Sequence, residues 1–113
     1  MPDYLHVKPD PNDGRTTLRV GGELDIGSAS ELQRAVDGTF DGQDGEFHLD
    51  MSDLTFMDST GAQALLHIHN AIEARGRHVV FEAPTGSVRG VLELLGLDQV
   101  LDIKPENSSL ETQ

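Results

Sequence analysis

Alternating apolar and polar residues predict two short strands at the start of the chain. Residues 4–8 and residues 16–21 each place a leucine and a valine on one face. Residues 9–14, between them, are rich in proline, aspartate, asparagine and glycine and end in an Asp-Gly pair typical of hairpin turns. We therefore expect the two strands to pair in antiparallel fashion.

Farther along the chain, segments with helical spacing alternate with short apolar runs. Ser28 and Glu31 predict a capping box, and Thr85 predicts a second helix N-cap. Gly76 and Gly96 are typical of residues that follow the last turn of a helix. The expected elements are a loop over residues 22–27, helices over 28–37, 59–76 and 85–96, an acidic loop over 37–45, and strands over 46–51, 78–82 and 100–103.

The order β-β-α-β-α-β-α-β predicts an α/β fold, with a small mixed sheet of about four or five strands and about three or four helices packed on it. The apolar run over residues 79–81 is typical of a central strand that is covered on both faces. A chain of 113 residues is long enough for one domain. We expect its core over about residues 4–103, followed by a polar, flexible tail over residues 104–113.

Composition and charge narrow the possible functions. The chain has no cysteine, which excludes disulfides and cysteine-based metal or redox sites. Its formal net charge of −12 disfavours nucleic acids and anionic membranes as direct partners. The same charge either keeps the protein soluble or attracts a basic partner protein, and both interpretations stay open. The N-terminus lacks the features of a signal peptide and no apolar run reaches membrane-spanning length, so a soluble cytoplasmic protein is expected. No cofactor is expected.

Residues 54–61, Leu-Thr-Phe-Met-Asp-Ser-Thr-Gly, carry the most informative chemistry. They join an apolar strand to a helix, so the hydroxyls of Ser59 and Thr60 should lie at a helix N-terminus. Backbone N–H groups are free there and the helix dipole is positive. Two interpretations follow. The first is that these residues cap the helix, because aspartate, serine and threonine are common N-caps. The second is a phosphorylation switch, because a phosphate on a hydroxyl at this place would be accepted without unfolding the helix.

The residue pattern favours neither metal binding nor catalysis. The acidic, glycine-rich loop after the first helix lacks the ligand spacing of an EF-hand. Asp50, Asp53 and Asp58 are more typical of residues that cap turns than of cation ligands. His67 lies two turns along the helix from Ser59, too far to act as its base. We therefore expect neither a metal site nor an enzyme.

Two segments resemble the anti-sigma factor antagonists, small bacterial proteins of the STAS domain family. Residues 20–25, Val-Gly-Gly-Glu-Leu-Asp, are similar to the family's strand ending in Gly-Glu-Leu-Asp. Residues 49–61 are an apolar strand that leads to Asp-Ser-Thr-Gly, the family's hallmark. With Leu-Leu-Gly-Leu at 94–97, the likeness extends over about residues 4–103.

This resemblance implies a switch that acts in transcription regulation. The unphosphorylated antagonist binds an anti-sigma factor that is also a serine kinase, and this binding releases a sigma factor. The kinase then phosphorylates Ser59, with Thr60 the less favoured target, and a serine phosphatase resets the switch. New charge beside Asp25, Asp53 and Asp58 would oppose docking. The expected partner-binding residues are Asp25, Asp58, Ser59, Thr60, Gly61 and Gln63.

The chain departs from the family pattern directly after the hallmark. The family often continues with Leu-Gly, whereas this chain has Ala62 and Gln63. The departure keeps a second interpretation open, a STAS scaffold or transporter-associated subunit that is not phosphorylated. Binding of a small ligand at the same helix N-terminus is a third and weaker interpretation.

Overall fold

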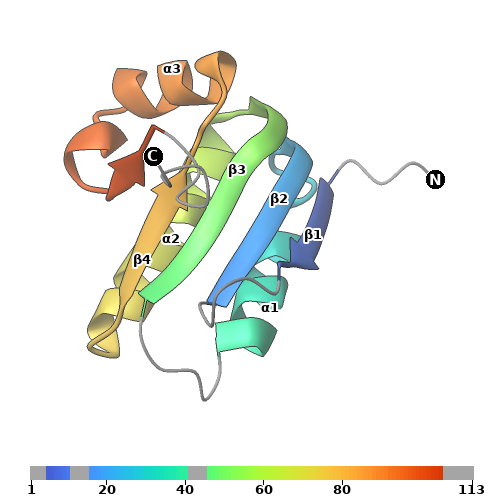
Figure 1. Ribbon diagram of the computed structural model, residues 1–113. Helices are drawn as coiled ribbons and strands as arrows, with labels where there is room; N and C mark the ends of the chain where they lie inside the picture. The colour runs from blue at the N-terminus through green and yellow to red at the C-terminus, as the bar shows by residue number, and fades with distance from the viewer. Residues whose placement is uncertain (1–4, 11–15, 41–45, 106–113) are drawn as a thin grey trace, which may run out of the picture.

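One mixed β-sheet organises the computed structural model, which describes residues 5–10, 16–40 and 46–105 (Figure 1). Its five strands lie in the order in which they follow along the chain. The first pair is antiparallel, as predicted, and the other neighbours are parallel. The strands are β1 (Leu5–Pro9), β2 (Thr16–Leu24), β3 (Glu46–Met57), β4 (His78–Glu82) and β5 (Ile103–Lys104). The helices are α1 (Ala29–Phe40), α2 (Ser59–Ala74) and α3 (Gly86–Leu94), with a 3-10 turn, η1 (Leu97–Gln99). This confirms the predicted α/β class.

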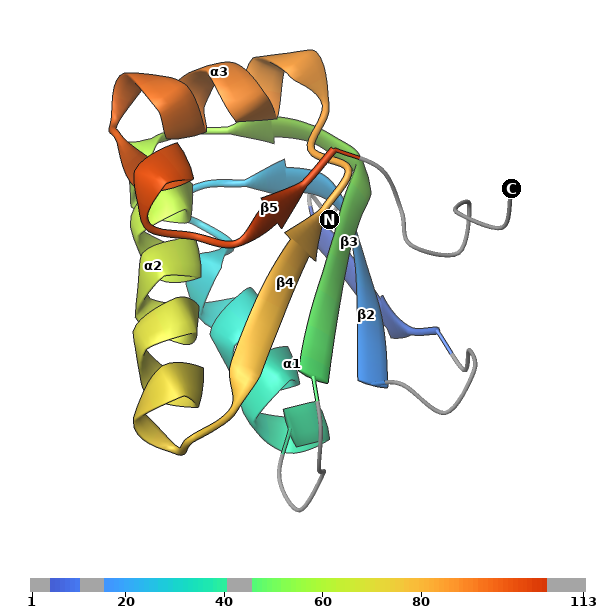
Figure 2. The same cartoon turned by 60° about the vertical axis from the view of Figure 1, so that its left-hand side comes forward.

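The helices α1 and α2 lie on one face of the sheet, and α3 lies across the end at which β3 finishes (Figure 2). The core fills the space between the sheet and these helices. Its largest fully buried apolar residues are Phe47, Phe81, Leu18, Leu24, Leu32, Leu49, Met51, Leu54, Leu65, Ile72 and Leu92. The predicted helical spacing of the apolar residues in α1 and α2 thus marks the faces that pack on the sheet.

The opposite face of the sheet carries polar residues that alternate with the core residues. In register across the five strands are Lys8, Arg19, Asp50, Glu82 and Lys104, here called the ionic row. Asp50 and Glu82 are only 2% and 1% exposed. Glu82 Oε2 lies 2.8 Å from Nδ1 of His48, and Asp50 Oδ2 lies 3.8 Å from Nε of Arg19. Buried carboxylates therefore have basic partners, as their burial requires.

Two strands are longer than the sequence pattern predicts. Residues 22–24 belong to β2 rather than to a loop, and β3 runs six residues past Met51 to Met57. The extensions pair with each other: Gly22 lies opposite Leu54, and Leu24 lies opposite Met57. Polar and glycine residues weaken the local strand signal there, and the bonds between the two strands override it. Helix α1 likewise ends at Phe40 instead of Asp37.

The C-terminal half matches the prediction more closely. Strand β4 has the predicted bounds, and its residues 79–82 are buried on both faces. Gly76 follows the end of α2 with a φ of 76°, and Gly96 follows α3 with a φ of 75°, as expected for residues in the left-handed region. The last strand is shorter than expected and follows η1. The predicted hairpin turn, the middle of the acidic loop and the tail beyond Pro105 lie outside the described residues.

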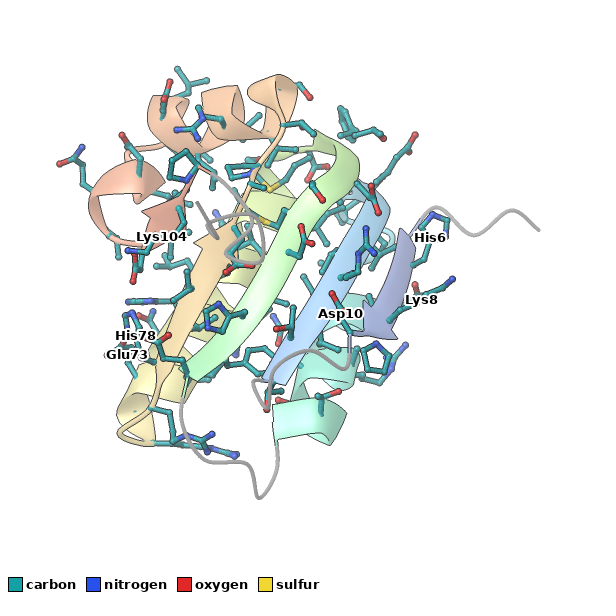
Figure 3. All side chains as sticks on the ribbon, in the orientation of Figure 1. His6, Lys8, Asp10, Glu73, His78 and Lys104 are labelled. Atoms are coloured by element: carbon teal, nitrogen blue, oxygen red, sulfur yellow. The ribbon has the colours of Figure 1, made fainter. Side chains whose placement is uncertain are left out.

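His78, the first residue of β4, connects α2 with the segment that leads to β5 (Figure 3). Its Nε2 lies 2.7 Å from Oδ2 of Asp102, and its Nδ1 lies 2.9 Å from Oε2 of Glu73. The hydrogen bond to Asp102, and to a smaller extent the one to Glu73, raises the pKa of His78 above 6.5. Partial burial of the ring acts in the opposite direction and lowers this pKa. The Nζ atom of Lys104 lies 3.7 Å from Oδ1 of the same Asp102 carboxylate.

The raised pKa predicts a pH-dependent contribution of His78 to stability. A pKa that is higher in the folded protein means that the charged ring stabilises the fold fully below about pH 6.5, and that this stabilisation is lost as the pH rises through the folded pKa. His78→Gln should therefore lower the free energy of unfolding at about pH 6 more than at about pH 9. Urea denaturation at both pH values measures this difference. His67→Gln, at an exposed histidine of α2, is the control. An equal loss for His78→Gln at both pH values would contradict the assignment.

Candidate functional site

The ends of β2 and β3 lie side by side and bring the two hallmark segments together. Leu24 and Met57 are paired, and the N–H of Asp58 donates to the carbonyl oxygen of Leu24 at 3.3 Å. Asp25 and Asp58 each follow directly after a strand end. The Gly-Glu-Leu-Asp and Asp-Ser-Thr-Gly segments, far apart in sequence, thus share one edge of the sheet.

Asp58 is the N-cap of α2. Its backbone is extended, and its Oδ1 accepts a hydrogen bond from the N–H of Gly61 at 2.9 Å. The capping interpretation of the hallmark is therefore correct for Asp58. Ser59 is the first residue of the helix and is exposed, and within the described part of the chain its hydroxyl has no hydrogen-bond partner. The residue that caps and the residue with the free hydroxyl are neighbours but distinct.

Gly61 packs directly against the backbone of Leu24 at the end of β2. A Cβ atom at this position would lie 2.3 Å from the carbonyl oxygen of Leu24 and 2.9 Å from its carbonyl carbon. Since real Cβ atoms do not approach that closely, the first turn of α2 rests on the backbone of β2 only because residue 61 is glycine. Gly61 itself is buried, so the hallmark glycine serves packing.

Asp25 orders the loop that follows β2. Its Oδ1 accepts from the N–H of Gly27 at 2.9 Å, and its own N–H donates to Oγ of Ser28 at 3.0 Å. The Ser28 hydroxyl in turn donates to the carbonyl oxygen of Glu23 at 2.8 Å. The predicted capping box is therefore wrong: the N–H of Glu31 donates to the backbone carbonyl of Ser28, whose side chain closes the loop instead.

Helix α3 is fastened to the end of β3 by two hydroxyls. Thr85 occupies the predicted N-cap position but forms no side-chain cap. Its Oγ1 donates to the carbonyl oxygen of Leu54 at 2.9 Å, and Oγ of Ser87 donates to that of Thr55 at 3.1 Å. The C-terminal part of β3 is therefore bonded to β2 on one side and to the start of α3 on the other.

Two exposed apolar side chains at this edge escaped the sequence analysis. Ile26, in the loop after β2, is 80% exposed, and Phe56, opposite Glu23 near the end of β3, is 46% exposed. Phe56 was missed because β3 was expected to end earlier. Exposed large apolar residues beside a functional segment are typical of binding surfaces.

Of the two residues that depart from the family pattern, one lies in the core and the other on the surface. Ala62 is fully buried, whereas Gln63 is exposed on the first turns of α2. Only Gln63 can therefore meet a partner. Thr60, between the exposed Ser59 and the buried Gly61, is half-buried.

The acidic residues considered as cation ligands do not converge. Asp53 Oδ2 lies 3.2 Å from NH2 of Arg19, beside the ionic row, whereas Asp58 caps α2. The described residues contain no group of three or more side chains able to hold a metal ion. His48 lies beside Glu82 on the face of the sheet opposite α1 and α2, here called the helix-free face.

The family comparison covers most of the chain. A family model described as Mlab, STAS domain, matches residues 7–103. The chain belongs to the STAS domain family. A search of curated proteins finds no match. None of the described helices is long and apolar enough to cross a membrane.

Several solved structures share this STAS fold. An anti-sigma factor antagonist from Mycobacterium paratuberculosis has a TM-score of 0.84 at 22% identity, with 96% of this chain and 92% of that chain covered. The anti-sigma factor antagonist SpoIIAA in its unphosphorylated form has a TM-score of 0.71 at 22% identity, with 94% of each chain covered. A sulfate transporter family protein from Wolinella succinogenes has a TM-score of 0.72 at 21% identity, with 84% and 80% covered.

The contact at Gly61 predicts a large effect of a single methyl group. Gly61→Ala should lower the free energy of unfolding by about 1–3 kcal/mol or more, because the Leu24 backbone cannot move away without disturbing β2. Gly90→Ala in α3 is the matched control, since a Cβ there meets nothing within 4 Å. Alanine is the better helix former, so the control should gain up to about 1 kcal/mol. Denaturant unfolding measures both, and a Gly61→Ala protein as stable as the control would refute the packing role.

Proposed function

We propose that this protein is an anti-sigma factor antagonist whose binding to an anti-sigma factor is switched off by phosphorylation of Ser59. The observation that carries the proposal is the exposed Ser59 hydroxyl at the first position of α2, next to an aspartate that already caps the helix. A kinase can reach this hydroxyl without breaking the cap. The structural likeness to proteins named as anti-sigma factor antagonists supports the same role.

The physical effect of the phosphate would be local. A phosphoserine adds about −1.5 to −2 charges and is tolerated at a helix N-terminus, where free N–H groups and the helix dipole favour an anion. The fold would therefore persist. Docking would fail, because the new charge lies beside Asp58 and near the Asp25 loop, in a surface shaped for a neutral hydroxyl. An unpaired charge buried in an interface is costly.

The partner in this proposal is an anti-sigma factor that is also a serine kinase using ATP, and a serine phosphatase restores the binding form. The protein itself acts by binding and not by catalysis, in the cytoplasm of a bacterium. We do not favour the alternative of a scaffold or transporter-associated subunit. Ala62 is buried and Ser59 is exposed, so the departure from the family pattern does not cover the phosphate acceptor.

The docking surface, here called the switch surface, comprises Asp25, Ile26, Phe56, Ser59 and Gln63. All five belong to the ends of β2 and β3, the loop after β2 or the first turns of α2. Ile26 and Phe56 offer apolar area for anchoring, and the carboxylates of Asp25 and Asp58 favour a partner with basic groups at the rim. Thr60 and Gly61 support this surface from beneath, since they are half-buried and buried.

Phosphorylation is predicted at Ser59. Incubation with ATP and a candidate kinase should give one phosphate per chain at Ser59, as located by mass spectrometry of peptides. The phosphorylated protein should keep its melting temperature but lose affinity for the kinase. Ser59→Ala should abolish the modification, and the control Thr60→Ala should retain it. Phosphate at Thr60 alone, or at neither residue, would count against the proposed switch.

The apolar anchors are predicted to contribute to partner affinity. Ile26→Ala and Phe56→Ala should each weaken binding to the anti-sigma factor by at least about 1 kcal/mol, because truncated anchor residues cost that much in typical interfaces. Leu94→Ala is a control with matched exposure: Leu94 is 84% exposed, at the far end of α3. Calorimetric titration of the three variants separates them. Equal affinities for all three variants would show that the anti-sigma factor does not bind at the switch surface.

A further inference from the structure

A polar cavity lies on the helix-free face of the sheet, on the side away from α2. Its volume is about 260 Å³, and its lining residues are His6, Lys8, Arg19, Gly21 and Asp53. Figure 3 shows His6 and Lys8 along β1, the edge strand that bounds the cavity. None of these five lining residues belongs to the switch surface, so the proposed switch does not account for this cavity.

Strand register brings the lining residues together. His6 pairs with Gly21, which pairs with Asp53 on β3, and Lys8 pairs with Arg19. The β2–β3 register shifts between Arg19 and Gly21, and a bulge of this kind re-aims the side chains beside it. The five lining residues therefore come from three strands that are separated in sequence.

Gly21 keeps the floor of the cavity open. A Cβ at this position would lie 3.1 Å from Cβ of Asp53 and 3.1 Å from Cδ2 of His6. A side chain at position 21 would therefore occupy the space between Asp53 and His6, and these neighbours would have to shift by a few tenths of an ångström. Close approach of neighbouring groups is a common reason for glycine inside a strand.

The cavity gathers basic side chains in a chain with a formal net charge of −12. Arg19 is held in place, with NH2 3.2 Å from Oδ2 of Asp53 and Nε 3.8 Å from Oδ2 of Asp50. The side chains of Lys8 and His6, in contrast, form no hydrogen bond or ion pair with any residue in the described ranges. Among the residues that the structure describes, the cavity thus gathers one guanidinium paired with Asp53 and two side-chain donors without a partner.

We propose that this cavity binds the phosphate group of a small phosphorylated alcohol or sugar. Guanidinium and ammonium groups are the usual partners of phosphate, and Arg19 has five N–H donors, so it can bind Asp53 and a ligand together. The net negative charge repels anions at long range, so an anion binds only where cations are concentrated.

The volume and the carboxylate narrow the ligand further. A cavity of about 260 Å³ is smaller than the usual sites for drug-sized ligands, and it matches a phosphate with a short substituent. Asp53 accepts hydrogen bonds, which matches a hydroxyl on that substituent and gives a phosphorylated alcohol one contact more than the phosphate group makes by itself.

Titration with glycerol 3-phosphate at constant ionic strength, followed by backbone amide NMR shifts, tests the proposal. The shifts should centre on His6, Lys8, Arg19 and Gly21. Lys8→Gln should weaken binding about tenfold, the effect of losing one charge-assisted hydrogen bond. The matched control is Lys104→Gln, which removes the same charge from the opposite edge of the same face and should change the dissociation constant less than about twofold.

Two further measurements make the test decisive. Gly21→Ala should weaken glycerol 3-phosphate binding by filling the cavity floor, and its amide spectrum checks that the variant folds. Inorganic phosphate should bind the natural chain more weakly than glycerol 3-phosphate does. Equal weakening by Lys8→Gln and Lys104→Gln, or shifts no larger than those from sodium chloride, would overturn the proposal. Equal affinity for inorganic phosphate would overturn the assignment of the hydroxyl-bearing substituent. None of these outcomes depends on Ser59.

Discussion

The first turn of α2 rests directly on the backbone at the end of β2, and the rest of the candidate site depends on this contact. Gly61 permits it, because any larger residue would overlap the Leu24 carbonyl. The hydrogen bond from Asp58 to the same carbonyl fixes the turn along the strand. The contact sets where α2 begins, which places the Ser59 hydroxyl in solvent at the edge of the sheet.

The hallmark tetrapeptide thus divides three physical tasks among neighbouring residues. Asp58 satisfies a free N–H of the helix, Gly61 allows close packing, and Ser59 remains available for chemistry. Because the cap does not use the serine hydroxyl, modification of that hydroxyl need not loosen the helix. A surface organised in this way can change its charge without changing its fold, which is what a partner-binding switch requires.

The two faces of the sheet have different physical characters. One face packs apolar side chains against α1 and α2, and the other carries the ionic row, with His48 and Glu82 nearly inaccessible to solvent. Buried ion pairs add little net stability, because desolvation offsets their attraction. Breaking one is costly, however, since it leaves a charge without a partner. At the β1 end of this row, the basic groups of Lys8 and Arg19 line the polar cavity.

Local patterns in the sequence determined the order and type of the elements, the ends of α2 and α3 at Gly76 and Gly96, and the place of Ser59 at a helix N-terminus. These features follow from hydrophobic periodicity and from backbone preferences within a few residues. Tertiary structure alone decided the full lengths of β2 and β3, the exposure of Phe56 and the cavity at Gly21. Each of these depends on groups about 30 residues apart or on the bonds between neighbouring strands, such as the pairing of Gly22 with Leu54 and of Gly21 with Asp53. No local pattern encodes such contacts, because they arise only when separate segments meet in the folded sheet.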